Sequence, residues 1–150
     1  MISRPDEKVT RLTTKSEAGT KKIGAQLGHS LKPGDTVCLY GGLGSGKTVF
    51  TKGIASALGI PEADVTSASF LLVAEHPGRV PLYHADLYRI EDPAQIDFLG
   101  LEEYPAMGGI TVIEWAERLP EDFDGCTHKV RIGIVRGRQR EIIIERAHEL

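Results

Sequence analysis

The chain has 150 residues, of which 41% are hydrophobic and 26% are charged, a composition typical of an ordinary globular domain. This length excludes a nucleotide-driven motor with separate coupling domains. The 18 Lys and Arg residues against 21 Asp and Glu residues give a formal net charge of −3, so the field of the whole protein does not favour binding of nucleic acid.

The N-terminal residues and the cysteines bear on location and redox chemistry. The segment Met1–Lys8 is polar and no apolar run reaches the length of a membrane span, so we expect a cytoplasmic protein without a membrane anchor. The two cysteines, Cys38 and Cys126, form no C-x-x-C pair, so a metal-thiolate site lacks support. We expect no disulfide, and we expect Cys38 to behave as a small buried side chain within a strand.

The first half of the chain predicts a strand, a helix, a second strand and a second helix. Val9–Thr13 is β-prone, and Thr14-Lys15-Ser16-Glu17 has the T-x-x-E form of a capping box, which predicts a helix to about Leu27. Asp35–Tyr40 is the mostly apolar run of a buried parallel strand. Val49–Leu58 has near-helical spacing of apolar residues, so it predicts the second helix.

The middle of the chain predicts a hairpin. Ser67–Glu75 and Val80–Tyr88 are strand candidates joined by a tight turn, so they should pair in antiparallel fashion. Pro93–Leu99 reads as a short helix with Asp92 as its N-cap.

The last third predicts a buried strand at Gly109–Glu114 and a final hairpin of His128–Val135 with Glu141–Ile144. The turn of this hairpin is the basic segment Arg136–Arg140. The segment between the second strand and the second helix has the glycine, lysine and threonine spacing of a phosphate-binding P-loop. Together with the elements, it predicts one α/β domain over residues 1–150: a single-domain P-loop NTPase with a mixed, mainly parallel central sheet and antiparallel hairpins.

The segment Gly41–Thr48 fits G-x-x-x-x-G-K-[ST], the phosphate-binding P-loop. Its glycines allow a tight fold that aims backbone N–H groups at phosphate, and the positive end of the following helix points the same way. Lys47 would reach the β- and γ-phosphates, and the Thr48 hydroxyl would ligate Mg²⁺. The order strand, loop, helix disfavours the alternative of a functionless Gly-rich turn. The candidate nucleotide-binding residues are Leu43, Gly44, Ser45, Gly46, Lys47, Thr48 and Val49.

Two acids lie at or near the ends of candidate strands, at the edge of the sheet where ligands bind. Glu114 ends a buried strand and could hold Mg²⁺, directly or through water, or polarise the attacking water; the alternative is a solvated acid. Asp86 shares a strand face with His84 and Tyr88, a polar set that lines either a cleft or solvent. The residues alone leave open which acid activates water.

Three other features have both a functional and an ordinary interpretation. Ser67-Ala68-Ser69 could sense the γ-phosphate through a hydroxyl or be a polar turn. Trp115 could pack beside a nucleotide or fill a boundary position. Arg136, Arg138 and Arg140 could contact phosphate, adenosine, RNA or acids of a partner, or be a solvated hairpin tip.

Four blocks of sequence carry a resemblance to a known family. They are Gly42-Leu43-Gly44-Ser45-Gly46-Lys47-Thr48, Ser67–Leu72, Tyr83-His84-Ala85-Asp86-Leu87-Tyr88-Arg89 and Ile113-Glu114-Trp115-Ala116-Glu117. With these blocks the chain resembles the TsaE (YjeE) family, small bacterial ATPases of tRNA threonylcarbamoyladenosine biosynthesis. The H-x-D-L-Y-R block followed by I-E-W is far more specific than the P-loop.

The resemblance implies ATP or ADP and Mg²⁺ as cofactors and assigns roles to matching positions. Lys47 and the P-loop backbone would hold phosphates, and Thr48 and Glu114 would hold Mg²⁺. Asp86 would be a catalytic or structural acid. Ser69 stands where the family has Thr in a switch-like loop near the γ-phosphate.

The same resemblance places Trp115 beside the site and makes Glu17 and Arg140 further nucleotide contacts. The chain departs from the family pattern at Gly42, Ala68 and Ser69, where Asp, Pro and Thr are usual. A switch loop without that Pro and the Thr methyl group should be looser, so we expect slower hydrolysis.

The function implied is that of an ATPase switch that resets a bacterial complex. TsaB- and TsaD-like partners would attach threonylcarbamoyl to adenosine 37 of tRNA, and this chain would meet tRNA only indirectly. Two alternatives stay open: a small-molecule kinase of the P-loop class, and a non-hydrolysing nucleotide-sensing interaction module.

Overall fold

The computed structural model describes residues 8–66 and 72–147, whose strands form one seven-stranded sheet. The strands are β1 (Lys8–Thr14), β2 (Thr36–Tyr40), β3 (Val73–His76), β4 (Leu82–Asp86), β5 (Ile110–Glu114), β6 (His128–Arg136) and β7 (Gln139–Arg146). The helices are α1 (Glu17–Ser30), α2 (Lys47–Ala57) and α3 (Ala94–Asp97), with short 3-10 turns at Glu62–Asp64, Tyr104–Met107 and Ala116–Arg118.

The sheet is parallel at its centre and antiparallel at both edges. The strand order is β1-β7-β6-β2-β5-β4-β3, in which β2 pairs in parallel with β5 and β6, and β4 pairs in parallel with β5. The pairs β1–β7, β6–β7 and β3–β4 are antiparallel. This mixed α/β sheet confirms the predicted fold class, including both hairpins.

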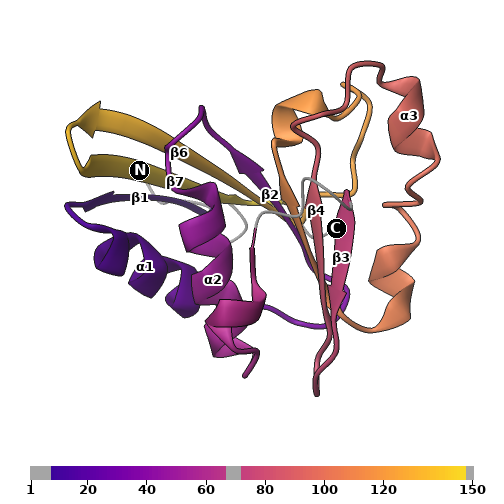
Figure 1. Ribbon diagram of the computed structural model, residues 1–150, viewed down its shortest axis with the longest axis horizontal. Coiled ribbons are helices and arrows are strands. Elements are labelled where there is room, and N and C mark those ends of the chain that lie inside the picture. The colour runs from indigo at the N-terminus through magenta and orange to yellow at the C-terminus, as the bar shows by residue number, and fades with distance from the viewer. Residues whose placement is uncertain (1–7, 67–71, 148–150) are drawn as a thin grey trace.

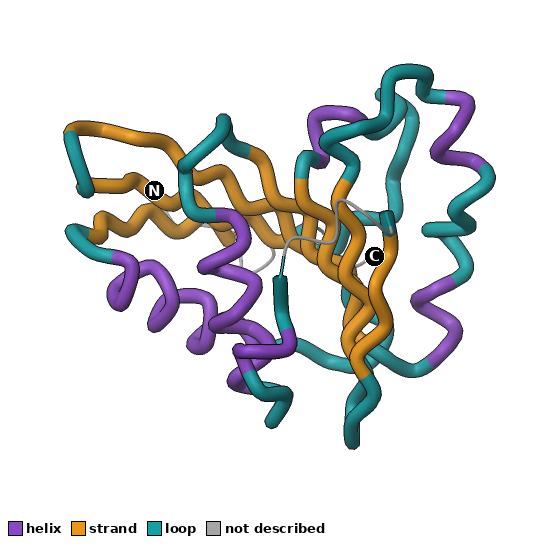
Figure 2. Tube along the Cα trace, in the orientation of Figure 1, coloured by secondary structure: helices purple, strands orange, loops and turns teal. Residues whose placement is uncertain are grey.

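Helical and irregular segments cover the two faces of the sheet separately (Figure 1). Helices α1 and α2 lie together on one face, where Leu39, Phe50 and Ile54 belong to one buried apolar cluster. The chain that follows β4, including α3, lies on the opposite side (Figure 2). Its Leu87 and Ile96 belong to a second buried apolar cluster. Since β2 and β5 are buried throughout or nearly so, their apolar runs fit central strands.

Two glycines allow α1 and α2 to pack unusually closely. A Cβ atom added at Gly53 would lie 2.1 Å from the carbonyl oxygen of Lys21, and one added at Gly24 would lie 2.3 Å from that of Phe50. Neither position has room for a methyl group. The close contact fixes α2, and with it the P-loop, against α1.

Several predicted boundaries were wrong by a few residues. The N-cap of α1 is Ser16, whose side chain accepts a hydrogen bond from the backbone N–H of Gly19 at 3.0 Å, so the T-x-x-E reading that placed the cap at Thr14 was wrong. Thr14 instead ends β1, and its hydroxyl bonds that of Thr20 at 2.9 Å. The prediction of Asp92 as the N-cap of α3 was also wrong, since the N-cap is Pro93, although the Asp92 carboxylate accepts a hydrogen bond from the N–H of Ala94.

The strands β3 and β4 are shorter than predicted, and β6 and β7 are longer. The first residues of the strand expected at Ser67–Glu75, and Ala68 and Ser69 with them, lie outside the described residues. Strand β4 ends at Asp86, so Tyr88 lies beyond it. Arg136 pairs with Gln139, which makes the last turn tighter than the predicted Arg136–Arg140 segment.

The expectation of no disulfide was wrong. Cys38 in β2 and Cys126, just before β6, form a disulfide with Cα atoms 6.0 Å apart. The two residues are 88 positions apart in sequence and meet because β2 and β6 are neighbouring parallel strands. Sequence spacing alone did not show this pairing.

The membrane prediction was tested over the described part of the chain. None of the helices in residues 8–66 and 72–147 is long and apolar enough to cross a membrane.

Candidate functional site

The P-loop lies between the end of β2 at Tyr40 and the start of α2 at Lys47. Gly44 has a φ of 74° and Gly46, the N-cap of α2, a φ of 112°; side chains with a Cβ rarely adopt either. The angle at Gly46 explains why the motif requires glycine there, and the angle at Gly44 explains a glycine at a position that the motif leaves variable. The first turn of α2 therefore opens towards the loop, as an anion site at a helix N-terminus requires.

Lys47 is held by groups of the protein itself. Its ammonium donates hydrogen bonds to the carbonyl oxygens of Gly41 and, at 2.9 Å, Gly42, and lies 3.9 Å from the centroid of the Trp115 ring. Burial lowers the pKa of Lys47, while the carboxylates of Glu117, Glu114 and Asp86 oppose that shift.

Trp115 adopts a left-handed backbone conformation with a φ of 59°, which is uncommon for a bulky residue. Its ring also packs against Tyr88, with ring centroids 4.8 Å apart. Strained residues of this kind cluster at functional sites. The sequence prediction that Trp115 lies beside the P-loop therefore agrees with its position.

Glu114 is the most enclosed acid of the site, with 2% of its surface exposed. Its Oε1 accepts a hydrogen bond from the Thr48 hydroxyl at 2.9 Å, and its Oε2 lies 2.5 Å from Nε2 of His84. The Thr51 hydroxyl lies 3.3 Å from the same Oε2. A buried carboxylate needs such partners to offset the loss of water.

Asp86 is the register partner of Glu114 on the neighbouring strand and is also buried. Its Oδ1 accepts a hydrogen bond from the N–H of Tyr88 at 2.9 Å, and its own N–H donates to the carbonyl of Leu72. Both acids thus stand at the carboxyl edge of the parallel strands, where ligands of α/β sheets bind.

A hollow of about 450 Å³ lies over the P-loop and brings most of the predicted site residues together. It is lined by Glu17, Leu43, Gly44, Ser45, Gly46, Lys47, Thr48, Val49, Asp86, Tyr88, Glu114 and Trp115. Of the predicted set, only Arg140 and Ser69 are absent from this lining, and Ser69 lies outside the described residues.

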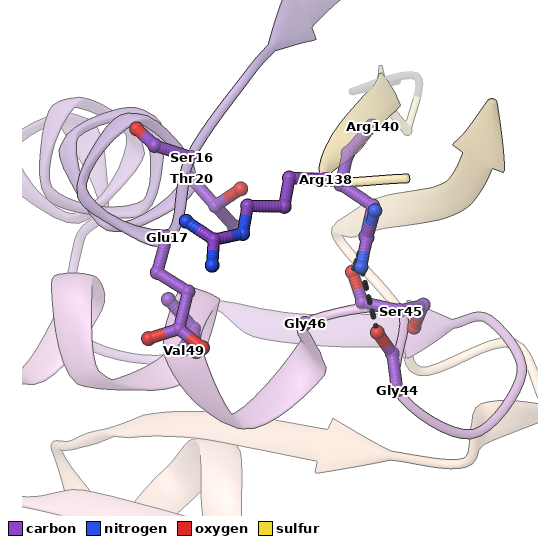
Figure 3. Close-up of a pocket in the computed structure, with 9 residues that line it drawn as sticks. All are labelled: Ser16, Glu17, Thr20, Gly44, Ser45, Gly46, Val49, Arg138 and Arg140. Atoms are coloured by element: carbon purple, nitrogen blue, oxygen red, sulfur yellow. Dashed lines mark hydrogen bonds between the residues drawn. The ribbon is translucent and has the colours of Figure 1, made fainter. Parts of the chain in front are cut away.

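A second hollow of about 420 Å³ adjoins the first and shares five residues with it: Glu17, Gly44, Ser45, Gly46 and Val49. It lies between the start of α1 and the last hairpin, from which Arg138 and Arg140 project (Figure 3). Arg140 donates to the carbonyl oxygens of Ser45 at 3.1 Å and Gly44 at 3.2 Å. In this conformation Arg140 therefore supports the P-loop backbone from the side.

The oxygen pair Thr48 and Glu114 has the chemistry of a magnesium site. The Thr48 hydroxyl donates to Glu114 Oε1 at 2.9 Å, so two oxygen donors of the kind that Mg²⁺ prefers lie side by side at the P-loop. Within the described residues no group of three or more His, Cys, Asp or Glu side chains could hold a metal. Such a site would thus depend on phosphate oxygens and water for its other ligands, which is the usual binding mode of Mg²⁺.

Sequence reasoning missed Thr51, which borders the site, and left the roles of three further bordering residues open: His84, Tyr88 and Arg138. A signal existed for Thr51, which follows Lys47 by four residues and so shares its helix face. His84 was noted as part of a polar strand face, but the pairing of β4 with β5 was not readable from the sequence.

Comparison with known proteins identifies the family. The sequence model of the family described as "Threonylcarbamoyl adenosine biosynthesis protein TsaE" matches residues 14–142. The chain belongs to the TsaE family. That match contains the P-loop, Asp86, Glu114 and Arg140, and it places the chain in a family of tRNA threonylcarbamoyladenosine biosynthesis.

Individual TsaE relatives are similar over much of their length. The chain is 36% identical to the TsaE protein of Treponema pallidum over 134 residues, which are 89% of this chain and 98% of the relative. It is 44% identical to TsaE of Bacillus subtilis over 108 residues, or 69% of this chain and 66% of the relative. The crystal structure of Bacillus subtilis YdiB superposes with a TM-score of 0.72 at 35% identity, covering 94% of this chain and 87% of that one.

Proposed function

We propose that this TsaE-family chain binds ATP with Mg²⁺ and hydrolyses it slowly, as the switch that resets the bacterial complex forming N6-threonylcarbamoyladenosine at position 37 of tRNA. Its work would be in the cytoplasm, with TsaB- and TsaD-like subunits as partners. The observation that carries the proposal is the pairing of the Thr48 hydroxyl with the Glu114 carboxylate beside the P-loop, at the floor of one hollow.

The residues of the loop and helix would bind the triphosphate. Residues 43–49 line the hollow, their backbone N–H groups would cradle phosphate, and Lys47 would exchange its carbonyl partners for phosphate oxygens. The adjoining hollow, with Glu17, Arg138 and Arg140 in its walls, would receive the nucleoside. Thr48 and Glu114 would hold Mg²⁺, which when bound neutralises charge on the β- and γ-phosphates.

The two acids would then have different tasks. Glu114 already accepts a hydrogen bond from the Thr48 hydroxyl and contacts His84, so its carboxylate is held in one orientation, in which it would bind the metal. Asp86 borders the same hollow on the neighbouring strand and would orient the attacking water or take its proton. This division of tasks supports Asp86 as the water-activating acid.

Release of the γ-phosphate would drive the switch. While the γ-phosphate is present, a hydroxyl such as that of Ser69 would keep its loop ordered. The loop would relax after cleavage, which is how nucleotide switches work. The threonylcarbamoyl transfer itself would belong to the partner subunits. The chain would therefore change the state of the complex without contacting adenosine 37.

The test compares ATP hydrolysis and tRNA modification for Lys47→Ala, Asp86→Ala and Glu114→Gln, each with and without the TsaB–TsaD pair. We expect all three variants to lose hydrolysis and to fail to support repeated modification. Glu121→Gln, a change of the same type at an exposed acid, is the control and should behave as wild type.

Three results would contradict the proposal. An ATPase rate that does not respond to the TsaB–TsaD pair would remove the coupled switch. A small metabolite that accelerates ADP formation and becomes phosphorylated would show a kinase. Tight nucleotide binding without turnover, with Glu114→Gln fully active in the complex, would show a sensing module.

A further inference from the structure

The imidazole of His84 lies beneath the site and contacts its central acid. His84 is on β4, is fully buried, and places Nε2 2.5 Å from Oε2 of Glu114, which is itself 2% exposed. Nothing in the P-loop or Mg²⁺ chemistry described above requires a histidine at this depth. A buried polar contact between side chains of two neighbouring strands therefore needs its own explanation.

The surroundings of the ring define which nitrogen carries hydrogen. Nδ1 of His84 is buried and has no hydrogen-bond partner among the residues that the structure describes. An unpaired buried N–H costs more than an unused lone pair on an aromatic nitrogen. The hydrogen therefore belongs on Nε2, where it is donated to Glu114.

The other contacts of Glu114 make His84 the main donor to Oε2. The Thr51 hydroxyl is 3.3 Å from that oxygen, but its single hydrogen also faces the carbonyl oxygen of Lys47 at 2.9 Å. Oε1 instead receives the Thr48 hydroxyl. His84 thus holds one carboxylate oxygen on the inner side and leaves the other directed at Thr48.

Strand register puts the imidazole within reach. Asp86 is opposite Glu114 in the β4–β5 pair, and His84 is opposite Val112. His84 and Glu114 are therefore diagonal neighbours on one face, a separation that long side chains span. The same register that brings Asp86 to the hollow brings His84 under it.

We propose that His84 is a positioning residue that orients the Glu114 carboxylate so that Oε1, with the Thr48 hydroxyl, binds a divalent cation. This inference rests on the proposed function, because it concerns the metal that accompanies the nucleotide. It predicts that loss of the Nε2 donor weakens metal binding much more than nucleotide binding. Loss of a hydrogen-bond partner of a metal ligand typically costs about 10- to 100-fold in metal affinity.

The experiment is a calorimetric titration of Mg²⁺ into the ADP complex, together with ADP binding in EDTA, for wild type, His84→Gln and His84→Asn. The Gln amide can place a donor where Nε2 stands, whereas the shorter Asn side chain cannot. We expect His84→Asn to bind Mg²⁺ roughly 10- to 100-fold more weakly with metal-free ADP affinity nearly unchanged. His84→Gln should recover most of the loss.

The possible failures are separable. A wild-type protein that binds ADP with no dependence on Mg²⁺ would refute the proposed function. A normal wild type with folded His84→Asn of equal Mg²⁺ affinity, or with folded Gln and Asn variants equally impaired, would refute the role of His84 alone.

A measurement on the wild type decides the case if the variants do not fold. Two-dimensional ¹⁵N–¹H NMR of the histidine ring identifies which nitrogen carries hydrogen. Hydrogen on Nε2 of His84 is the expected result, and hydrogen on Nδ1 with a bare Nε2 would overturn the inference.

Discussion

The ammonium of Lys47 lies 3.9 Å from the centroid of the Trp115 ring, so the cation of the P-loop rests on the only tryptophan of the chain. Contacts of this kind contribute about 0.5–2 kcal/mol. Lys47 also donates to two loop carbonyls. A nucleotide must therefore draw the ammonium away from partners that it already has.

That contact predicts an optical signal. Because Trp115 loses or changes its cation neighbour when phosphate arrives, its fluorescence should shift or change in intensity on addition of ADP or ATP with Mg²⁺. Lys47→Gln should abolish the change, whereas Lys52→Gln on the same helix should retain it. Unchanged emission from wild type, with binding demonstrated by calorimetry, would contradict this prediction.

Arg140 should matter through its fork of hydrogen bonds rather than its charge. Its Nε and one terminal nitrogen bond the carbonyls of Ser45 and Gly44, which a Lys ammonium cannot reproduce. We expect Arg140→Lys to weaken ADP binding by about 1–1.5 kcal/mol, roughly tenfold in Kd. Arg138→Lys is the comparison. A larger loss of ADP affinity in Arg138→Lys than in Arg140→Lys would contradict the prediction that Arg140 is the more important of the two.

Close packing of the two long helices predicts a sharp steric effect. Gly53→Ala should lower the free energy of unfolding by about 1–3 kcal/mol, although Ala favours an isolated helix, since its methyl group would meet the Lys21 carbonyl. Gly133→Ala, where a Cβ atom would meet nothing within 4 Å, should be close to neutral. Urea denaturation measures both, and equal stability of the two variants would argue against the packing.

The disulfide predicts redox-dependent stability. It closes a sequence separation of 88 residues, and such cross-links typically contribute about 2–4 kcal/mol to the free energy of unfolding. Reduction, or the double change Cys38→Ala with Cys126→Ala, should lower the melting temperature. A thiol titration of the denatured, non-reduced protein that finds two free thiols would show that the bond does not form.

His76 predicts a loss of stability in mild acid. Burial lowers the pKa of His76 below its ordinary 6.5, His84 lowers it further, and Asp64 opposes the shift. As the pH falls below 6.5, His76 becomes protonated in the unfolded chain but stays neutral in the folded protein. The free energy of unfolding therefore decreases until the pH has passed the pKa of His76 in the folded protein. His76→Gln should flatten this part of the curve in urea titrations, and an unaltered slope would exclude His76 as its source.

The sequence was sufficient for those features that are local or follow a general rule. The P-loop of Gly41–Thr48 is a contiguous motif, and Glu114 and Asp86 lie at or near the ends of predicted strands, where ligands of α/β sheets bind. The antiparallel pairs of the mixed sheet were predicted from the short turns of the two hairpins. These residues line one hollow, and predicting that they lie together did not require the register of the strands.

The features that sequence reasoning missed depend on contacts between distant segments. The Cys38–Cys126 bond joins neighbours in the sheet that are far apart in the chain. The role of His84 needs the exact pairing of β4 with β5. The cap of α1 was misplaced because Thr14 and Ser16 offer similar hydroxyl groups, and only the end of β1 decides between them.

Arg140 stands in β7 directly opposite Thr14, the last residue of β1. The P-loop is thus supported by a residue of the β1–β7 pair, and these two strands are the first and the last of the sheet in chain order. Affinity tags or trimmed termini that loosen β1 or β7 would alter nucleotide binding while every motif residue stayed intact.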